Sequence, residues 1–210
     1  KVFPGLITTF DVSLAQKFEE KRIESEVSVY IEPKLDGIRC FAIVENGTST
    51  LYARSGKIIS NFSATIGKEL SLLPDGCYDG EIMGEDFISL MRQAYRKENI
   101  ETKDTYLALF DYLPLKDWQT KETSMTCRER YGKLYTSLFH AGTLKYLRHV
   151  ERRTVTADFS EIIKIHDEYV ALGYEGAMIK IINAPYKFGR GHEVMKLKAF
   201  HDVDLKIKEL

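Results

Sequence analysis

The segment EPKLDGIR, residues 32–39, places a lysine, a carboxylate, a glycine and an arginine close to one another. A lysine amine can act as a nucleophile only after it loses its proton, which requires desolvation or neighbouring cations. The grouping therefore suits phosphoryl transfer in which Lys34 itself attacks phosphorus. The alternative is an ordinary strand and turn with solvated Lys34 and Asp36 side chains, and the rest of the chain must distinguish the two.

Strand patterns flank this segment. Apolar residues alternate with polar ones over 27–31, which predicts a half-buried strand that delivers Lys34 at its end. We expect a second strand over 38–44 and a third over 50–53, joined by a hairpin turn at 45–47. This arrangement brings together three cations: Lys34, Arg39 and Arg54.

Two capping boxes and two apolar stripes predict helices. Residues 13–16 and 126–129 have the serine or threonine and the glutamine or glutamate of a helix start. Helical spacing predicts a helix over 131–139, whose aromatic stripe belongs to the core, and another over 159–170 that ends at Gly173.

The remaining polar segments, 97–104 and 116–125, are expected to be surface loops. The 210 residues fit one large domain or two small ones, and no internal repeat or low-complexity linker divides them. These patterns indicate an α+β fold with mainly antiparallel strands and flanking helices.

The composition, 44% hydrophobic and 29% charged, is typical of a soluble globular protein. There is no apolar run long enough to span a bilayer and no secretion signal, so we expect a cytoplasmic protein. Cys40, Cys77 and Cys127 lack the CxxC spacing, which favours reduced thiols over zinc ligands or disulfides. The net charge is -1, but residues 180–198 hold five lysines or arginines and a single acid, a local strip that can hold phosphates.

The chain lacks the glycine-rich loops that commonly bind nucleotide phosphates. Gly-Lys pairs occur at 56–57, 67–68 and 132–133, but none has the preceding glycine of a P-loop, and no GxGxxG motif follows a strand. Bound phosphates would therefore be held by side-chain cations and a metal.

The segment EPKLDGIR resembles the first signature of the covalent nucleotidyltransferases, which comprise ATP-dependent DNA ligases, RNA ligases and mRNA-capping guanylyltransferases. The segment YKFGR, 186–190, resembles one found in the shortest viral DNA ligases. Five further segments match the superfamily in order: ARSGK (53–57), YDGEI (78–82), LFDYL (109–113), YEGAMIK (174–180) and VMKLK (194–198). The resemblance covers nearly the whole chain and is to the adenylation domain of a small ATP-dependent DNA ligase, similar to phage and algal-virus enzymes.

This resemblance implies an architecture of two packed, mainly antiparallel sheets with the nucleotide in the groove between them, the ATP-grasp-like fold of DNA ligase adenylation domains. Residues 1–200 are expected to form that domain. Residues 201–210 are expected to begin a linker or strand toward a C-terminal OB-fold domain, which the family normally carries and which is not part of this chain.

The resemblance also implies a reaction. Lys34 would attack the α-phosphorus of ATP, release pyrophosphate and carry AMP, which then passes to the 5′-phosphate of a DNA nick before the 3′-hydroxyl displaces it. Lys196 and Lys198 alternate along a strand, so both face one side, where they would stabilise transition-state charge and bind the nucleotide. Asp36 would belong to the same catalytic cluster.

Carboxylates and an aromatic complete the expected nucleotide site. By resemblance Glu81 contacts ribose and metal, and Glu175 contacts metal, since Mg²⁺ (or Mn²⁺) favours carboxylate oxygens. Phe110 would stack on adenine, and Glu32 would accept a hydrogen bond from the adenine 6-amino group, which favours ATP over GTP. Taken singly, either Glu81 or Glu175 is more often a turn residue, and Phe110 is more often a core residue.

A set of basic and polar residues matches the family's contacts to the nick 5′-phosphate, and Arg39 and Arg54 match contacts to the nucleotide as well. The arginine fork suits phosphate, although each residue alone could be a surface ion-pair partner. The set is Arg39, Arg54, Ser55, Lys57 and Arg190.

Three alternatives stay open. An RNA ligase commonly lacks the arginine at position 39, and a capping guanylyltransferase usually has Asp-Gly where this chain has 175–176 as Glu-Gly. A degenerate nucleotide- or DNA-binding module would not need every chemical residue to be present. We therefore expect a monomeric DNA ligase core that binds ATP and nicked duplex DNA and no membrane.

Overall fold

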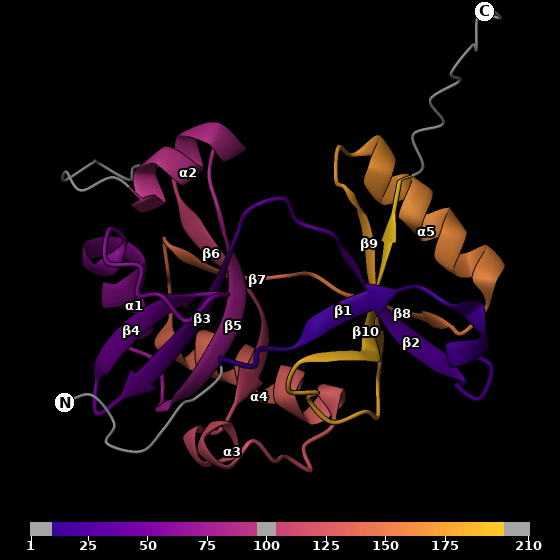
Figure 1. Ribbon diagram of the computed structural model, residues 1–210, viewed down its shortest axis with the longest axis horizontal. Helices are drawn as coiled ribbons and strands as arrows, with labels where there is room; N and C mark the ends of the chain where they lie inside the picture. Colours follow the sequence, from indigo (N-terminus) through magenta and orange to yellow (C-terminus); the bar gives the residue numbers. More distant parts are fainter. Residues whose placement is uncertain (1–9, 96–103, 200–210) are drawn as a thin grey trace, which may run out of the picture.

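Two five-stranded β-sheets with helices on their outer faces form the protein (Figure 1). The computed structural model describes residues 10–95 and 104–199. The strands are β1 Leu14–Lys17, β2 Ser28–Pro33, β3 Ile38–Glu45, β4 Thr48–Ala53, β5 Gly76–Met83, β6 Tyr106–Leu113, β7 Leu147–His149, β8 Arg153–Thr156, β9 Gly176–Ile181 and β10 Arg190–Lys198. The helices are η1 Glu20–Arg22, η2 Ser63–Gly67, α1 Lys68–Leu70, α2 Phe87–Tyr95, α3 Leu115–Thr120, α4 Cys127–Ala141 and α5 Phe159–Ala171.

The first sheet has the strand order β1-β10-β9-β2-β8, and only the β1–β10 pair is parallel. Apolar and polar residues alternate along its strands, so one face of the sheet is apolar and packs against α5. The residues of that core include Ile31 on β2, Ile179 on β9 and Leu197 on β10. Because side chains on a strand alternate between faces, their neighbours Glu32, Lys180 and Lys196 point to the opposite face.

The second sheet has the order β4-β3-β5-β6-β7, with a parallel pair only at β6–β7. Its outer face is covered by η2, α1, α2 and α4, whose apolar residues join the largest core cluster. That cluster includes Ile66 on η2, Leu90 on α2 and Leu134 on α4. The inner face again carries the alternate residues, among them Arg39 on β3 and Glu81 on β5.

A third apolar cluster lies on the inner face of the second sheet, beside the polar groups. Trp118 of α3 packs on Phe41 with ring centroids 4.2 Å apart, and Tyr186 from the β9–β10 connection joins the same cluster. The cluster therefore joins elements of both sheets next to the inner-face polar residues.

The structure confirms the expected architecture of two mainly antiparallel sheets, and the local patterns near Lys34 are confirmed as β2, β3 and β4. The β3–β4 hairpin turns at Asn46 and Gly47, which both have positive φ (51° and 70°), as a two-residue turn of this hand requires. Thr126 and Glu129 form the expected capping box, in which the Thr126 amide donates to Glu129 Oε2 at 2.8 Å. Gly173 follows α5 with φ 91°.

Four expectations were wrong. Residues 13–16 do not start a helix, because 14–17 form β1 beside β10. Segment 116–125 is not simply a surface loop, since α3 buries Trp118 there. On α4 the aromatic stripe is only partly core: Tyr135 is 50% exposed and Phe139 71% exposed. Val27, expected in the half-buried strand, precedes β2 and is 88% exposed.

The expected loop at 97–104 lies outside the described residues except for Asp104, and the expected strand toward a further domain at 201–210 lies outside them entirely. Among the helices of residues 10–95 and 104–199, none has the length and apolar character needed to cross a membrane. All three cysteines are free and buried, and burial raises the pKa of each thiol. Buried thiols with raised pKa are poor nucleophiles, so the chemistry must rest on other side chains.

Candidate active site

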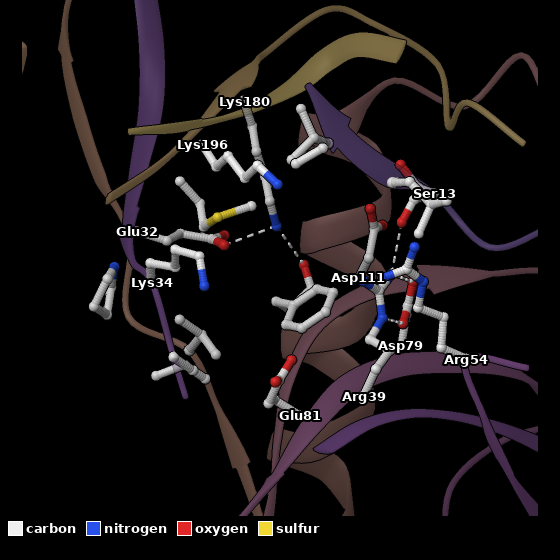
Figure 2. A pocket seen from close by; sticks show the side chains of 18 of the residues that line it. Ser13, Glu32, Lys34, Arg39, Arg54, Asp79, Glu81, Asp111, Lys180 and Lys196 are labelled. Carbon is white, nitrogen blue, oxygen red and sulfur yellow. Dashed lines mark hydrogen bonds and ion pairs between the residues drawn. The ribbon is translucent and has the colours of Figure 1, made fainter. Parts of the chain in front are cut away.

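A pocket of about 240 Å³ opens between the inner faces of the two sheets. Figure 2 shows the labelled side chains of the first sheet on one side and those of the second sheet opposite them. Six residues predicted from sequence to act together with Lys34 line it: Glu32, Arg39, Arg54, Glu81, Phe110 and Lys196. Arg190 also lines it, at the start of β10.

Lys34 directly follows β2, and its ammonium group forms an ion pair with the Glu175 carboxylate. The backbone explains this contact. The amide of Lys34 donates to the carbonyl of Gly176 at 2.9 Å, and the amide of Glu175 donates to the carbonyl of Lys34 at 3.2 Å. Gly176 has φ 138°, and a Cβ there would lie 2.0 Å from the Leu197 carbonyl oxygen. Only glycine allows β9 and β10 to approach so closely beside Glu175.

A group of cations surrounds the same end of the pocket. Burial lowers the pKa of Lys196, and repulsion from Lys198, Arg190, Lys34 and Arg54 lowers it further. Arg190 donates from Nη1 to the Ala15 carbonyl oxygen at 3.0 Å. Mutually repelling cations gathered at one pocket favour an anionic ligand with several charges, such as a polyphosphate.

Glu81, on β5, supplies a second carboxylate near Lys34. Its Oε1 accepts a hydrogen bond from the amide of Gly37 at 3.2 Å. Burial raises the pKa of Glu81, although Arg39, the Gly37 amide and Lys34 act in the opposite direction. A buried carboxylate of raised pKa gains from a further positive partner.

The donor set fits a hard divalent cation only if the ligand contributes oxygens. Within residues 10–95 and 104–199 there is no cluster of three or more His, Cys, Asp or Glu side chains able to hold a metal alone. Glu81 and Glu175 offer two carboxylates, and Mg²⁺ commonly binds through one or two carboxylates plus substrate phosphates. The residues present therefore fit a hard divalent cation that is shared with the phosphate oxygens of a ligand.

Arg39 lies in the pocket wall opposite Lys34, with its side chain 20% exposed. Its Nε and Nη2 donate to the two oxygens of Asp79 at 2.6 and 2.7 Å, and Nη2 also reaches the Ser13 carbonyl oxygen at 3.0 Å. The Tyr186 hydroxyl donates to Asp79 Oδ2 at 2.9 Å and accepts from the Ser13 amide at 2.8 Å. This network joins β3, β5, the residue before β1 and the β9–β10 connection.

A β-bulge on β6 turns two consecutive residues into the pocket. Gly80 pairs with Leu109 and Asp79 pairs with Asp111, so Phe110 is the extra residue. Leu109 packs in the outer core, while Phe110 and Asp111 both line the pocket. Without the bulge, strict alternation would direct Asp111 into the apolar core.

Asp111 is paired with a buried arginine. Arg130 Nε and Nη2 donate to the two oxygens of Asp111 at 2.7 and 3.2 Å, and Nη1 donates to the Met125 carbonyl oxygen at 2.7 Å. Burial disfavours the charged form of Asp111, but Arg130 outweighs it and holds the pKa of Asp111 below its usual value. The pair fixes the N-terminus of α4 to the bulge.

We expect Arg130→Met to destabilise the protein by about 3–5 kcal/mol, because it leaves the buried Asp111 charge unpaired. The exposed Arg153–Glu168 pair offers the control: Arg153→Met should cost at most about 1 kcal/mol. Urea unfolding measures both. An equal loss of unfolding free energy in Arg130→Met and Arg153→Met would contradict a stabilising role for the buried Arg130–Asp111 pair.

The pH dependence of the Arg130→Met effect has a defined sign. The folded-state pKa of Asp111 is lowered, so its stabilising effect is fully present above the ordinary aspartate pKa of about 3.9. It is lost as the pH falls through the lowered folded-state value. The difference between wild type and Arg130→Met should therefore shrink in acid.

Glu32 lines the pocket from β2, on the same side as Lys34 and Lys196 in Figure 2, and its side chain is only 2% exposed. It forms ion pairs with Lys180, at 2.8 Å from Nζ to Oε2, and with Arg152. Figure 2 shows the contact between Glu32 on β2 and Lys180 on the neighbouring strand β9.

Other predicted site residues lie at the edge. Asp36, Ser55, Lys57 and Lys198 are exposed and are not among the residues that line the pocket, and Glu175 reaches it through Lys34. The sequence predicted no individual role for Asp79, Asp111 and Arg152, and it placed Lys180 only in the basic strip of residues 180–198. Three of them stand inside segments already singled out, YDGEI, LFDYL and YEGAMIK, whereas Arg152 belongs to no motif.

A family model described as the ATP dependent DNA ligase domain matches residues 12–198. The DNA ligase of Archaeoglobus fulgidus is 27% identical over 201 residues, which cover 89% of this chain and 35% of that protein. The DNA ligase of Enterobacteria phage T4 is 24% identical over 257 residues, covering 99% of this chain and 52% of that protein. The chain thus spans about a third to a half of the length of these relatives.

A solved structure named Pmar-Lig_Pre is similar to this protein with a TM-score of 0.82 at 29% sequence identity, covering 91% of this chain and 47% of that one. The similarity therefore extends over both sheets and the pocket between them. With a family model that matches from just before β1 to the end of β10, this chain belongs to the ATP-dependent DNA ligase domain family.

Proposed function

We propose that this chain is the catalytic core of an ATP-dependent DNA ligase that works through a covalent lysyl-AMP intermediate. The observation that carries the proposal is the position of Lys34. It lies between two carboxylates, Glu81 and Glu175, and a group of mutually repelling cations, at one end of a pocket that has an aromatic side chain in its wall.

In the first step the Lys34 Nζ, once deprotonated, attacks the α-phosphorus of ATP. A P–N bond forms, the bond between the α-phosphorus and the bridging oxygen breaks, and pyrophosphate leaves with its electron pair. The proton of the amine goes to solvent. Lys196 and Lys198, together with Arg54 and Arg190, place positive charge where the phosphates gain negative charge.

Glu81 and Glu175 would hold Mg²⁺ (or Mn²⁺) jointly with phosphate oxygens, and the ion would supply positive charge that neutralises the triphosphate. Glu175 holds Lys34 in an ion pair. Release of that ion pair would remove the carboxylate that favours the ammonium form, so that Lys34 can give up its proton to solvent and attack through the freed lone pair. Asp36, exposed in the turn after Lys34, stays in this proposal as a member of the catalytic cluster.

The base end of the pocket suits adenine. The Phe110 ring offers an apolar face for stacking. Glu32 lines the same pocket and offers a carboxylate acceptor to the adenine 6-amino group, whereas guanine presents a carbonyl oxygen there. This chemistry favours ATP over GTP.

In the later steps AMP passes from Lys34 to the 5′-phosphate of a nick, and the 3′-hydroxyl then attacks that phosphorus and releases AMP. Contacts to the nick phosphates come from a basic rim of the pocket. We assign to it Arg39, Arg54, Ser55, Lys57 and Arg190. Arg39 is already bound to Asp79, so its part is to shape the site as well as to add charge.

The basic rim predicts how DNA binding depends on salt. Each neutralised phosphate contributes about 0.9 to the slope of log affinity against log salt, so Arg54→Gln should lower that slope by about 0.9. The control is Lys164→Gln on α5, which packs on the face of the first sheet away from the pocket. Fluorescence anisotropy with a nicked duplex measures both. An unchanged slope in Arg54→Gln, or an equal change in Lys164→Gln, would remove Arg54 from the DNA contact.

The nucleotide assignment is tested by incubating the protein with Mg²⁺ and either α-labelled ATP or α-labelled GTP. We expect label from ATP to join the protein through an acid-labile bond, and label from GTP to join far more slowly. A preference for GTP would indicate a capping guanylyltransferase instead. The curated relatives described above are DNA ligases, which favours nick sealing over RNA joining.

A further inference from the structure

Three buried charges meet at the base end of the pocket. The side chains of Glu32, Arg152 and Lys180 are 2%, 3% and 4% exposed, respectively. Arg152 contacts Glu32 Oε1, and Lys180 Nζ lies 2.8 Å from Oε2, so both carboxylate oxygens have a cationic partner. A carboxylate held from two sides has little freedom to rotate.

The same two cations also bind the backbone of the residue that carries the stacking ring. Arg152 Nη2 donates to the carbonyl oxygen of Phe110 at 3.0 Å, and Lys180 Nζ donates to it at 3.2 Å. Phe110 is the extra residue of the β6 bulge, and both hydrogen bonds reach its carbonyl oxygen at this irregular point of the strand.

Arg152 lies where the chain crosses between the sheets, in the connection from β7 to β8 (Figure 1). The amide of Val150 in this connection donates to the Leu109 carbonyl oxygen at 2.8 Å, next to the bulge. The guanidinium of Arg152 stacks on Tyr131, 3.7 Å from the ring centroid, with Tyr30 at 4.9 Å. A planar guanidinium that is packed and hydrogen-bonded in this way is fixed in orientation.

We propose that Arg152 is a positioning residue for purine selection, which sets the Glu32 carboxylate on the first sheet and the Phe110 ring on the second at one fixed separation. The inference rests on the proposed function, because it takes the pocket to hold the base of a nucleotide. Glu32 then contacts the edge of the adenine while the Phe110 ring stacks on its face. Glu32 can accept a hydrogen bond from the 6-amino group only if Phe110 holds the adenine at the right distance. Lys180 contributes to the same contact from β9.

The test compares Arg152→Met and Arg152→Lys with wild type. In Arg152→Met the Kd for ATP should rise about 10- to 100-fold, the effect of losing hydrogen bonds to a charged group, and GTP binding should change less. The ATP-over-GTP preference in adduct formation should fall by a similar factor, mainly through KM and not through kcat. Arg152→Lys keeps the charge but not the fork, so it should recover only part of the preference.

Two control arginines separate positioning from general destabilisation. Arg130→Met also breaks a buried ion pair beside the bulge, yet Arg130 contacts neither Glu32 nor the Phe110 carbonyl, so this variant should keep the nucleotide preference. Arg153→Met, at an exposed pair, should keep both activity and preference. Isothermal titration gives the two Kd values, and intact mass gives the AMP and GMP adducts.

The outcomes also separate this inference from the proposed function. If wild type forms the AMP adduct while Arg152→Met and Arg152→Lys keep the wild-type preference, the positioning role is wrong and the proposed function stands. If Arg130→Met loses the preference as Arg152→Met does, the effect is general and the inference is again overturned. A wild-type protein that binds neither nucleotide and forms no adduct would overturn both.

Discussion

Lys34→Ala protein should carry no AMP after incubation with ATP and Mg²⁺, whereas wild type should carry one. The variant lacks the amine that attacks phosphorus, and no binding energy can replace a missing nucleophile. The fold should survive, because Lys34 and Glu175 form a partly exposed pair, with side chains 18% and 35% exposed, whose loss costs at most about 1 kcal/mol. Intact mass and urea unfolding measure the two results.

Two further lysines of the pocket make this test informative. Lys180 and Lys196 also line it, so either could in principle accept AMP. The matched control is Lys164→Ala on α5, which should form the adduct at the wild-type rate. An AMP adduct on Lys180 or Lys196 in the Lys34→Ala protein would show that Lys34 is not the required nucleophile.

The second large effect concerns the carboxylates. Glu81→Ala and Glu175→Ala should each slow AMP attachment by about 10²–10³-fold, the loss expected when a group that stabilises transition-state charge is removed. Glu168→Ala on α5, an exposed glutamate paired with Arg153, should leave the rate unchanged. Single-turnover rates across a Mg²⁺ titration measure all three variants.

The two carboxylates should differ in their pH dependence. Burial raises the pKa of Glu81, so this carboxylate takes up a proton at a higher pH than an exposed glutamate does. In wild type, the stimulation of AMP attachment by Mg²⁺ should therefore be lost at a correspondingly higher pH on acidification. Glu81→Gln should lose this acidic limb, and Glu175→Gln should keep it. If a variant at either position kept the wild-type rate of AMP attachment at every Mg²⁺ concentration, the substituted glutamate would not be a metal ligand.

The fold around Lys34 was predictable because it is local. Alternation and the Asn46–Gly47 turn specify β2, β3 and β4 within a short stretch of chain, so periodicity alone finds them. The failure at 13–16 has the opposite cause. β1 exists because it pairs in parallel with β10, which lies far along the chain, and local capping signals contain no information about that partner.

Some residues of the candidate site were predictable from local sequence and others were not. Lys34, Glu81 and Glu175 stand in motifs whose residue types and spacing indicate their chemistry. Asp111 depends on a bulge that moves it from the core face to the pocket face, which no alternation pattern shows. Arg152 depends on a crossover between sheets and on three partners distant in sequence, so only the folded structure identifies it.

We propose that Lys34 carries AMP on its way to a DNA nick. The most direct measurement isolates wild-type protein labelled from α-labelled ATP, removes free ATP, and adds a nicked duplex with a 5′-phosphate and Mg²⁺. Peptide mapping should find the label on Lys34 before the addition, and the label should then leave the protein as the nick is sealed and AMP is released. Label found on another residue, or label that stays on Lys34 while the nick remains open, would contradict the account.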